Sequence, residues 1–300
     1  MLWLAAAISA YFLFALGNLG DKFVLSGPPK PQSYTFWVAA GGLLSVLLIP
    51  FIGFSMPGWA ELAVIMVAGS SYLFGLYFLY SALENGEVSK IMPALGGFLA
   101  IFTLIFSSIL FRTGDFFSLK NIAAFILLFG GSMAAVWEKG KSPAKKSLKT
   151  IALAAFFFAA NYNFSKIVFA SQPFLQGFIW MRLATFLAAL IVFARIALPE
   201  IFSPKPVFNK KTAGYFVMAQ TAGGTGFLLE SLAISLVSAA LLPFVVVVQG
   251  VQYIFLFFLS YLLSFKISFF KESFSREAVM QRILALALII FGLLVLAFAK

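Results

Sequence analysis

Cysteine and histidine are both absent from the 300-residue sequence. Without them the chain cannot form disulfide bonds, offer a thiolate nucleophile or ligate haem or zinc through these side chains, and it lacks the most common general base. A complete Gly-x-x-x-x-Gly-Lys-Ser/Thr phosphate-binding loop is also missing, which argues against ATP hydrolysis by this chain. We therefore expect no catalytic residues, no cofactor and no metal site.

Charged residues are scarce as well, at 10% of the chain against 62% hydrophobic residues. Soluble domains carry about 25% charged residues and could not bury this much apolar surface. Apolar runs long enough to cross a hydrocarbon core follow one another almost end to end, and they lack the alternating pattern of β-barrel strands. The sequence therefore predicts an all-α integral membrane protein.

The apolar runs divide into ten predicted transmembrane helices. They cover residues 2–24, 34–54, 59–83, 91–111, 119–137, 151–169, 174–198, 213–235, 239–265 and 283–298. The first run has no basic leader and no small-residue cleavage site after it, so we interpret it as a retained helix rather than a signal peptide. Of the 21 Lys and Arg residues, 16 lie in or beside the connections that follow the odd-numbered runs. Because basic loops stay cytoplasmic, both termini are predicted to be non-cytoplasmic, by default at a bacterial cytoplasmic (inner) membrane.

The sequence contains two similar halves. Phe14 and Lys22 recur as Phe158 and Lys166 at a constant offset of 144. Because each half holds an odd number of helices, the second half must enter the membrane from the opposite side, which gives two inverted five-helix repeats of the kind found in secondary transporters. The first repeat, a basic linker and the second repeat are predicted at residues 1–138, 139–149 and 150–300.

The motifs of the two repeats follow a common order. Each repeat opens with a helix that carries a small polar turn and then a lysine, as in Asn18 with Lys22 and Asn163 with Lys166. The second repeat continues with Arg182, and each fourth helix begins with Val-Ser and a proline. This pattern resembles the drug/metabolite transporter superfamily in its ten-helix EamA-type form. The resemblance covers essentially the whole chain, and it implies transport without naming the solute.

Four charged residues within the predicted helices are candidates for function, because a charge in the bilayer is costly unless it is paired or used. Lys22 and Lys166 lie near helix ends, so they either extend to the headgroups or line a cavity as a symmetric pair that attracts an anion. Arg182 lies deeper and needs a partner, which is either structural or an anionic substrate. Glu230 is the candidate for carrying a proton or binding a substrate amine, with an ion pair to Arg182 or Lys166 as the structural alternative.

Uncharged polar residues form a second group of candidates. An amide or hydroxyl group in hydrocarbon seeks a partner, so these side chains should face the interior of the bundle and offer hydrogen bonds to a polar solute. Together with the three basic residues above, they give the full predicted substrate-binding set: Asn18, Lys22, Ser71, Tyr72, Asn163, Lys166, Arg182, Gln220, Thr221, Gln249, Gln252 and Tyr253. Interhelical packing is the alternative role, and it weighs less for Gln249 and Gln252, which are bulkier and more polar than packing requires.

Three functions remain open on this sequence. The first is a secondary transporter that moves a small polar metabolite, such as an amino acid or related zwitterion, by alternating access, with proton coupling through Glu230 as an option. The second is an exchanger of organic anions such as phosphorylated or nucleotide-linked compounds, because Lys22, Lys166 and Arg182 outnumber Glu230. The third is an intramembrane enzyme or a non-transporting membrane subunit, although no paired intramembrane carboxylates at helical spacing support catalysis.

The expected partners follow from the same features. They are a small-molecule substrate and the lipid bilayer, with the chain as a monomer or homodimer. Nucleic acid is not expected despite the net charge of +11, because the basic residues lie in short connections between apolar runs and not in a separate basic domain.

Overall fold

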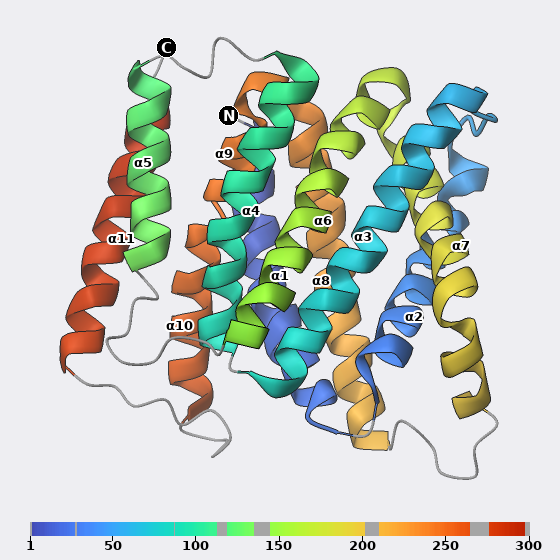
Figure 1. Cartoon of the computed structure of the whole chain (residues 1–300), viewed down its shortest axis with the longest axis horizontal. Coiled ribbons are helices and arrows are strands. Elements are labelled where there is room, and N and C mark those ends of the chain that lie inside the picture. Colours follow the sequence, from blue (N-terminus) through green and yellow to red (C-terminus); the bar gives the residue numbers. More distant parts are fainter. Residues whose placement is uncertain are drawn as a thin grey trace.

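The computed structural model describes residues 2–27, 29–86, 88–112, 119–134, 145–201, 210–264 and 276–297. All regular structure within these ranges is helical, as the sequence predicts, and Figure 1 shows the long helices arranged side by side. In chain order the elements are α1 (Leu2–Leu25), α2 (Pro31–Gly41), η1 (Gly42–Phe51), α3 (Trp59–Asn85), α4 (Val88–Phe111), α5 (Leu119–Ala134), α6 (Lys145–Ser171), α7 (Phe174–Ile201), α8 (Lys210–Leu236), η3 (Ala239–Leu241), α9 (Leu242–Val247), α10 (Gly250–Ser264) and α11 (Arg276–Ala297). The elements η1 and η3 are 3-10 helices.

Seven helical segments of the described chain are long and apolar enough to cross a membrane. They lie in α1, in α2 together with η1, in α3, α4, α6 and α7, and in the segment from η3 to α10. Large apolar side chains cover their outer surfaces, with Phe51 83%, Ile109 70% and Ile191 73% exposed. An apolar surface of this extent marks contact with a membrane or another apolar partner. The chain is thus a multi-pass helical membrane protein, which is the class that its composition predicts.

The 27-residue helix α8 is not one of these seven segments. Its middle carries Gln220, Thr221, Gly223, Gly224 and Glu230, which lower its hydropathy. Among the described helices, α8 and α1 pack against each other over the longest contact. Gly20 of α1 permits this close approach, since a Cβ added there would come within 2.7 Å of the Cβ of Ala219. Small residues serve the same purpose at many helix crossings in membranes.

Helices from the two halves of the sequence pack on one another. Besides α1 on α8, helix α3 packs on α6 and α7, α2 packs on α7, and α5 packs on α11. In Figure 1 the ribbons of α3 and α6, which are far apart in the sequence, run next to each other through the middle of the bundle. The two halves are therefore interleaved.

The second predicted helix, residues 34–54, begins earlier in the structure and changes its form midway. Pro31 starts α2 at a position where the missing N–H costs no hydrogen bond. After Gly41 the backbone continues for ten residues as the 3-10 helix η1. Two successive glycines weaken the α-helix at this junction, and Pro50 cannot donate a backbone hydrogen bond further on. A 3-10 helix of this length is uncommon, and such stretches often mark hinges.

The ninth predicted helix, residues 239–265, is broken in the structure. Helix α9 ends at Val247 and α10 begins at Gly250. Between them the N–H of Gln249 donates to the carbonyl of Val246 at 2.9 Å, which is the tight i to i−3 pattern of a 3-10 turn. Discontinuous helices commonly line the sites of transporters, and Gln249 lies at this break.

The predicted starts of the sixth and tenth helices also shift. Helix α6 begins at Lys145, so residues 145–149 of the predicted linker are helical, while residues 139–144 lie outside the described ranges. Helix α11 begins at Arg276 rather than at residue 283. Both helices extend past the apolar core because backbone hydrogen bonding does not stop where the apolar run ends.

Candidate functional site

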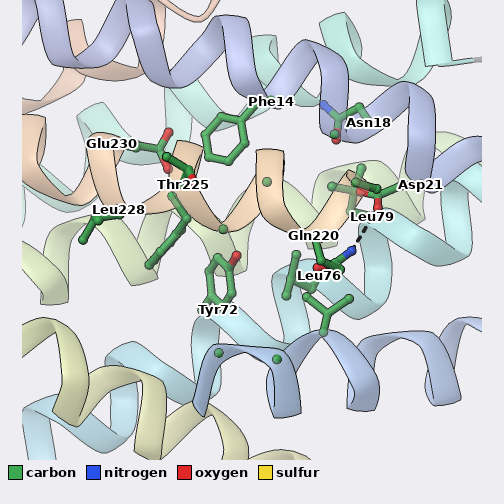
Figure 2. Close-up of a pocket in the computed structure, with 18 of the residues that line it drawn as sticks. Phe14, Asn18, Asp21, Tyr72, Leu76, Leu79, Gln220, Thr225, Leu228 and Glu230 are labelled. Atoms are coloured by element: carbon green, nitrogen blue, oxygen red, sulfur yellow. Dashed lines mark hydrogen bonds between the residues drawn. The ribbon is translucent and has the colours of Figure 1, made fainter. Parts of the chain in front are cut away.

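A cavity of about 520 Å³ lies within the bundle. Residues of α1, α2, η1, α3, α4, α6, α7, α8 and α10 line it, together with Gln249 at the break between α9 and α10. Figure 2 shows Asn18 and Asp21 of α1, Tyr72 of α3 and Gln220 of α8 around the same space. Small-molecule sites in proteins have about 300–1,000 Å³, so the cavity has the size of a metabolite site.

Most of the cavity wall is apolar or aromatic, and charge is rare in it. The aromatic lining residues are Tyr11, Phe14, Tyr72, Tyr80, Phe158, Tyr162, Phe178, Phe216 and Phe227. Among the described lining residues, those with a charge are Asp21, Arg182 and Glu230. Because apolar surface surrounds these three groups, each interacts with a bound charge more strongly than it would in water.

Arg182 of α7 lies against two neighbouring aromatic rings. Its guanidinium carbon lies 4.2 Å from the ring centre of Tyr72 and 3.9 Å from that of Phe227, which is the geometry of a cation–π contact. The side chain is 7% exposed, and its Nε and Nη2 atoms have no hydrogen-bond partner. In the described chain neither Asp21 nor Glu230 forms a salt bridge with it. The unpaired Nε and Nη2 atoms are thus the donors of this group that remain for an anion.

Asp21 of α1 is a buried carboxylate that the sequence analysis missed. The hydroxyl of Tyr34 in α2 donates to Asp21 Oδ1 at 2.5 Å, and Gln220 Nε2 of α8 donates to the same oxygen at 3.2 Å. Gln220 Nε2 also donates to the hydroxyl oxygen of Tyr34 at 3.1 Å. Three helices therefore orient this carboxylate through Oδ1, while within the described chain Oδ2 accepts no hydrogen bond. The signal for Asp21 was its charge inside an apolar run, which the adjacent Lys22 obscured.

Glu230 of α8 lies in the cavity wall as a second buried carboxylate, 2% exposed. The hydroxyl of Tyr162 in α6 donates to Glu230 Oε1 at 2.6 Å. Within the described residues it forms no ion pair with Arg182 or Lys166, which was the structural alternative raised by the sequence. A neutral hydroxyl thus holds this carboxylate, and its charge is left without a fixed counter-ion.

Gln249 and Gln252 also line the cavity, and they pair with each other. Gln249 Nε2 donates to Gln252 Oε1 at 3.3 Å. The other amide atoms, Gln249 Oε1 and Gln252 Nε2, are buried without a hydrogen-bond partner. Buried amide groups are rarely left unpaired in proteins, so this pair leaves one acceptor and one donor unsatisfied in the wall of the cavity.

The two candidate lysines lie elsewhere, at the ends of other helices. Lys22 Nζ donates to the carbonyls of Leu83 and Glu84 at the end of α3, at 2.6 and 3.4 Å. Lys166 Nζ donates to the carbonyls of Ile234, Ser235 and Val237 around the end of α8. Neither lysine belongs to the described lining of the cavity. Each ammonium satisfies carbonyl groups that a helix end leaves without intrahelical donors.

Replacing Lys166 with methionine should lower the free energy of unfolding by about 1–3 kcal/mol, because several carbonyls at the end of α8 lose their charged donor. Thermal unfolding in detergent measures this effect, and Lys149→Met at an exposed position of the same helix is the matched control. Ligand affinity should stay within about twofold of the wild type. A large loss of affinity with unchanged thermal stability would instead place Lys166 in the substrate site.

The remaining predicted site residues divide between the cavity and the surrounding core. Asn18, Tyr72, Gln220 and Thr221 line the cavity, as do Arg182, Glu230, Gln249 and Gln252. Ser71, Asn163 and Tyr253 are buried outside the described lining of this cavity. Asn163 accepts a hydrogen bond from Ser107 at 2.8 Å, and the Tyr253 hydroxyl donates to the carbonyl of Met92 at 3.0 Å. These latter contacts join helices.

Comparison with known proteins identifies the fold and no more. No family model matches the chain, and none of the curated proteins matches it. A solved structure described only as "Crystal structure of protein" superposes with a TM-score of 0.66 at 18% sequence identity, over 97% of this chain and 96% of its own. At this identity the likeness extends to the fold alone.

Proposed function

We propose that the chain is a secondary transporter of ten transmembrane helices, of the drug/metabolite transporter EamA type, which carries a small zwitterionic metabolite by alternating access. The observation that carries the proposal is a single cavity that holds charges of both signs inside a membrane-spanning bundle. Arg182 suits a carboxylate, and Asp21 and Glu230 suit an ammonium group. A solute that is neutral overall but charged at both ends matches such a lining.

Contacts between the helices support the inverted repeat. Under the sequence offset, α1 corresponds to α6 and α3 corresponds to α8. Helix α1 packs on α8, and the corresponding helix α6 packs on α3. Lys22 binds carbonyls at the end of α3, as Lys166 does at the end of α8. In Figure 1 α1 begins and α11 ends at the same edge of the bundle, as an even number of crossings requires. With the Lys and Arg bias, this edge is the non-cytoplasmic side of a bacterial inner membrane.

Under the proposed repeat, the pair of α3 and α7 corresponds to the pair of α8 and α2, and the two pairs are packed differently. This difference supports alternating access. Helix α3 packs along α7, and Thr185 Oγ1 of α7 donates to the carbonyl of Gly69 in α3 at 3.1 Å. The counterparts α8 and α2 meet through Gln220 and Tyr34, and beyond this contact the cavity lies between α8 and η1. A carrier open to one side is expected to close one such pair and part the other.

Uptake by reconstituted vesicles tests the proposal. Purified protein in liposomes should take up labelled amino-carboxylates in a saturable way, and unlabelled compound of the same kind should compete. Crosslinking α3 to α7 should stop uptake, since the closed side must open during each cycle. Recovery of chemically altered solute would overturn the transport function in favour of an enzyme, and vesicles that take up no solute of any class would overturn it as well.

Glu230→Gln should abolish the response of uptake to an imposed proton gradient while leaving solute exchange at equilibrium largely intact. The glutamine keeps the size of the side chain but cannot release a proton, whereas exchange requires only the movement of the loaded carrier. Tyr162→Phe is the matched control, because it removes the hydroxyl donor to Glu230 and keeps the carboxylate. An unchanged gradient response in Glu230→Gln would exclude this residue from coupling.

Organic-anion exchange is the second candidate function. The unpaired Nε and Nη2 atoms of Arg182 favour it, since they suit a phosphate as well as a carboxylate. An exchanger requires counter-substrate on the far side of the membrane, so empty vesicles should then show no uptake. Anion exchange should also tolerate Asp21→Asn, whereas carriage of a zwitterion should not.

A further inference from the structure

The cavity holds its opposite charges at a distance, and this distance restricts the ligand. Gln220, which contacts Asp21, and Phe227, which contacts Arg182, are on the same helix, α8. They are seven residues apart in the sequence, which corresponds to about 10 Å along an α-helix. An α-amino acid carries its two charges too close together to reach both groups.

Asp21 suits the ammonium end better than Glu230 does. Tyr34 and Gln220 both bind Oδ1 of Asp21, and Oδ2 accepts no hydrogen bond within the described chain. Asp21 lines the cavity, so this second oxygen is the one left for a ligand. Glu230 is more enclosed, at 2% against 7% exposure for Asp21, and Tyr162 covers one of its oxygens.

The cavity between the two charged groups is open and mainly apolar. Gly223 and Gly224 of α8 lie between Gln220 and Phe227 and belong to the lining. A Cβ added at either glycine would meet no atom within 4 Å. Leu76 and Leu79 of α3 contribute apolar surface to the same cavity (Figure 2). This part of the cavity suits a hydrocarbon linker.

We infer that the cavity selects a solute whose ammonium and carboxylate groups stand at the two ends of an apolar chain, with the ammonium on Asp21 and the carboxylate on Arg182. Allowing one hydrogen bond of about 2.8 Å at each end, the span of about 10 Å leaves about 5 Å between the ligand's own charges. ω-Amino acids with a linker of intermediate length have this spacing. The inference rests on the proposed transport of zwitterions and narrows its substrate class.

A series of ω-amino acids measures the spacing directly. Unbranched compounds with one to about eight methylene groups between amine and carboxylate span the distance in question. Binding to the detergent-purified chain is measured by calorimetry, and uptake of the same compounds is measured in proteoliposomes. We expect affinity to peak at about two to four methylene groups, at least tenfold above glycine.

Two variants test the two parts of the inference. Asp21→Asn should weaken the best compound at least tenfold and remove the advantage of the amine over the plain alkyl carboxylate. Gly224→Val should fill the linker region, leave both charged groups in place and reduce affinity for the best compound by a similar factor. Because Gly224 faces open space, this second variant keeps the test valid even if Asp21→Asn does not fold.

The outcomes separate the inference from the transport function. If glycine or other α-amino acids bind best and are transported, the spacing inference is wrong and transport stands. If Glu230→Gln, and not Asp21→Asn, removes the advantage of the amine, the assignment of the ammonium to Asp21 is wrong. If the compounds bind with the expected optimum but none is transported, the binding inference stands and the transport function fails.

Discussion

Substituting glutamine for Arg182 should weaken binding of a carboxylate solute by about 10- to 100-fold, which corresponds to the loss of a charge-assisted hydrogen bond of about 1.5–3 kcal/mol. The same substitution should leave the unfolding temperature unchanged or raise it. In the described chain Arg182 has no carboxylate partner and two of its nitrogens are unpaired, so its burial costs free energy that glutamine recovers. Ligand affinity and thermal unfolding in detergent measure the two effects.

The controls for Arg182 separate its charge from its shape. Arg182→Lys keeps the charge but loses the planar group that contacts the rings of Tyr72 and Phe227, so it should restore affinity only in part. Arg195→Gln changes an exposed arginine of the same helix and should alter neither affinity nor stability by more than experimental scatter. A fall in stability with unchanged affinity would show that Arg182 is a structural residue.

Alanine at Gly69 should destabilise the protein by about 1–3 kcal/mol and reduce uptake at least tenfold. A Cβ there would come within 2.7 Å of Ala184 Cβ, 2.8 Å of Thr185 N and 2.9 Å of Met181 O in α7. Two of these atoms belong to the backbone, so α3 and α7 must move apart. The hydrogen bond from Thr185 to the Gly69 carbonyl is then lost, and the side of the bundle that we propose to be closed no longer seals.

Gly130→Ala is the matched control for this prediction, because an added Cβ at Gly130 of α5 meets no atom within 4 Å. Alanine favours the helix over glycine, so this control should keep or raise the unfolding temperature. Vesicle uptake and thermal unfolding are measured on both variants. Normal uptake in a destabilised Gly69→Ala protein would mean that the contact between α3 and α7 supports the fold and takes no part in the transport cycle.

The sequence predicts the helical class and part of the cavity for a clear physical reason. A charge or a large amide inside an apolar run is costly, so it stands out, and Arg182, Glu230, Gln249 and Gln252 were found in this way. All four line the cavity. Asp21 follows the same rule, but it lies directly before Lys22, and a pair of opposite charges near a helix end is easily taken for an interfacial feature.

The contacts that complete the site depend on tertiary structure. Tyr34 and Tyr162 bind the two carboxylates, yet a tyrosine in a membrane helix has no distinctive pattern of its own. The positions of the lysines illustrate the same point. Lys22 was placed near a helix end, but the carbonyls that it binds belong to α3, some 60 residues further along the chain. Only the packing of α1 beside α3 brings these groups together.

The 3-10 form of η1 also affects how far the second membrane segment reaches. A 3-10 helix rises about 2.0 Å per residue, whereas an α-helix rises about 1.5 Å. The ten residues of η1 therefore extend about 5 Å further than the same residues would as an α-helix. The segment Pro31–Phe51, which has 21 residues, consequently spans about 36.5 Å instead of about 31.5 Å. The hydrocarbon core of a bilayer is about 30 Å thick, so the segment is longer than the core. It can therefore tilt, or shorten by several ångströms, without drawing its ends into the bilayer.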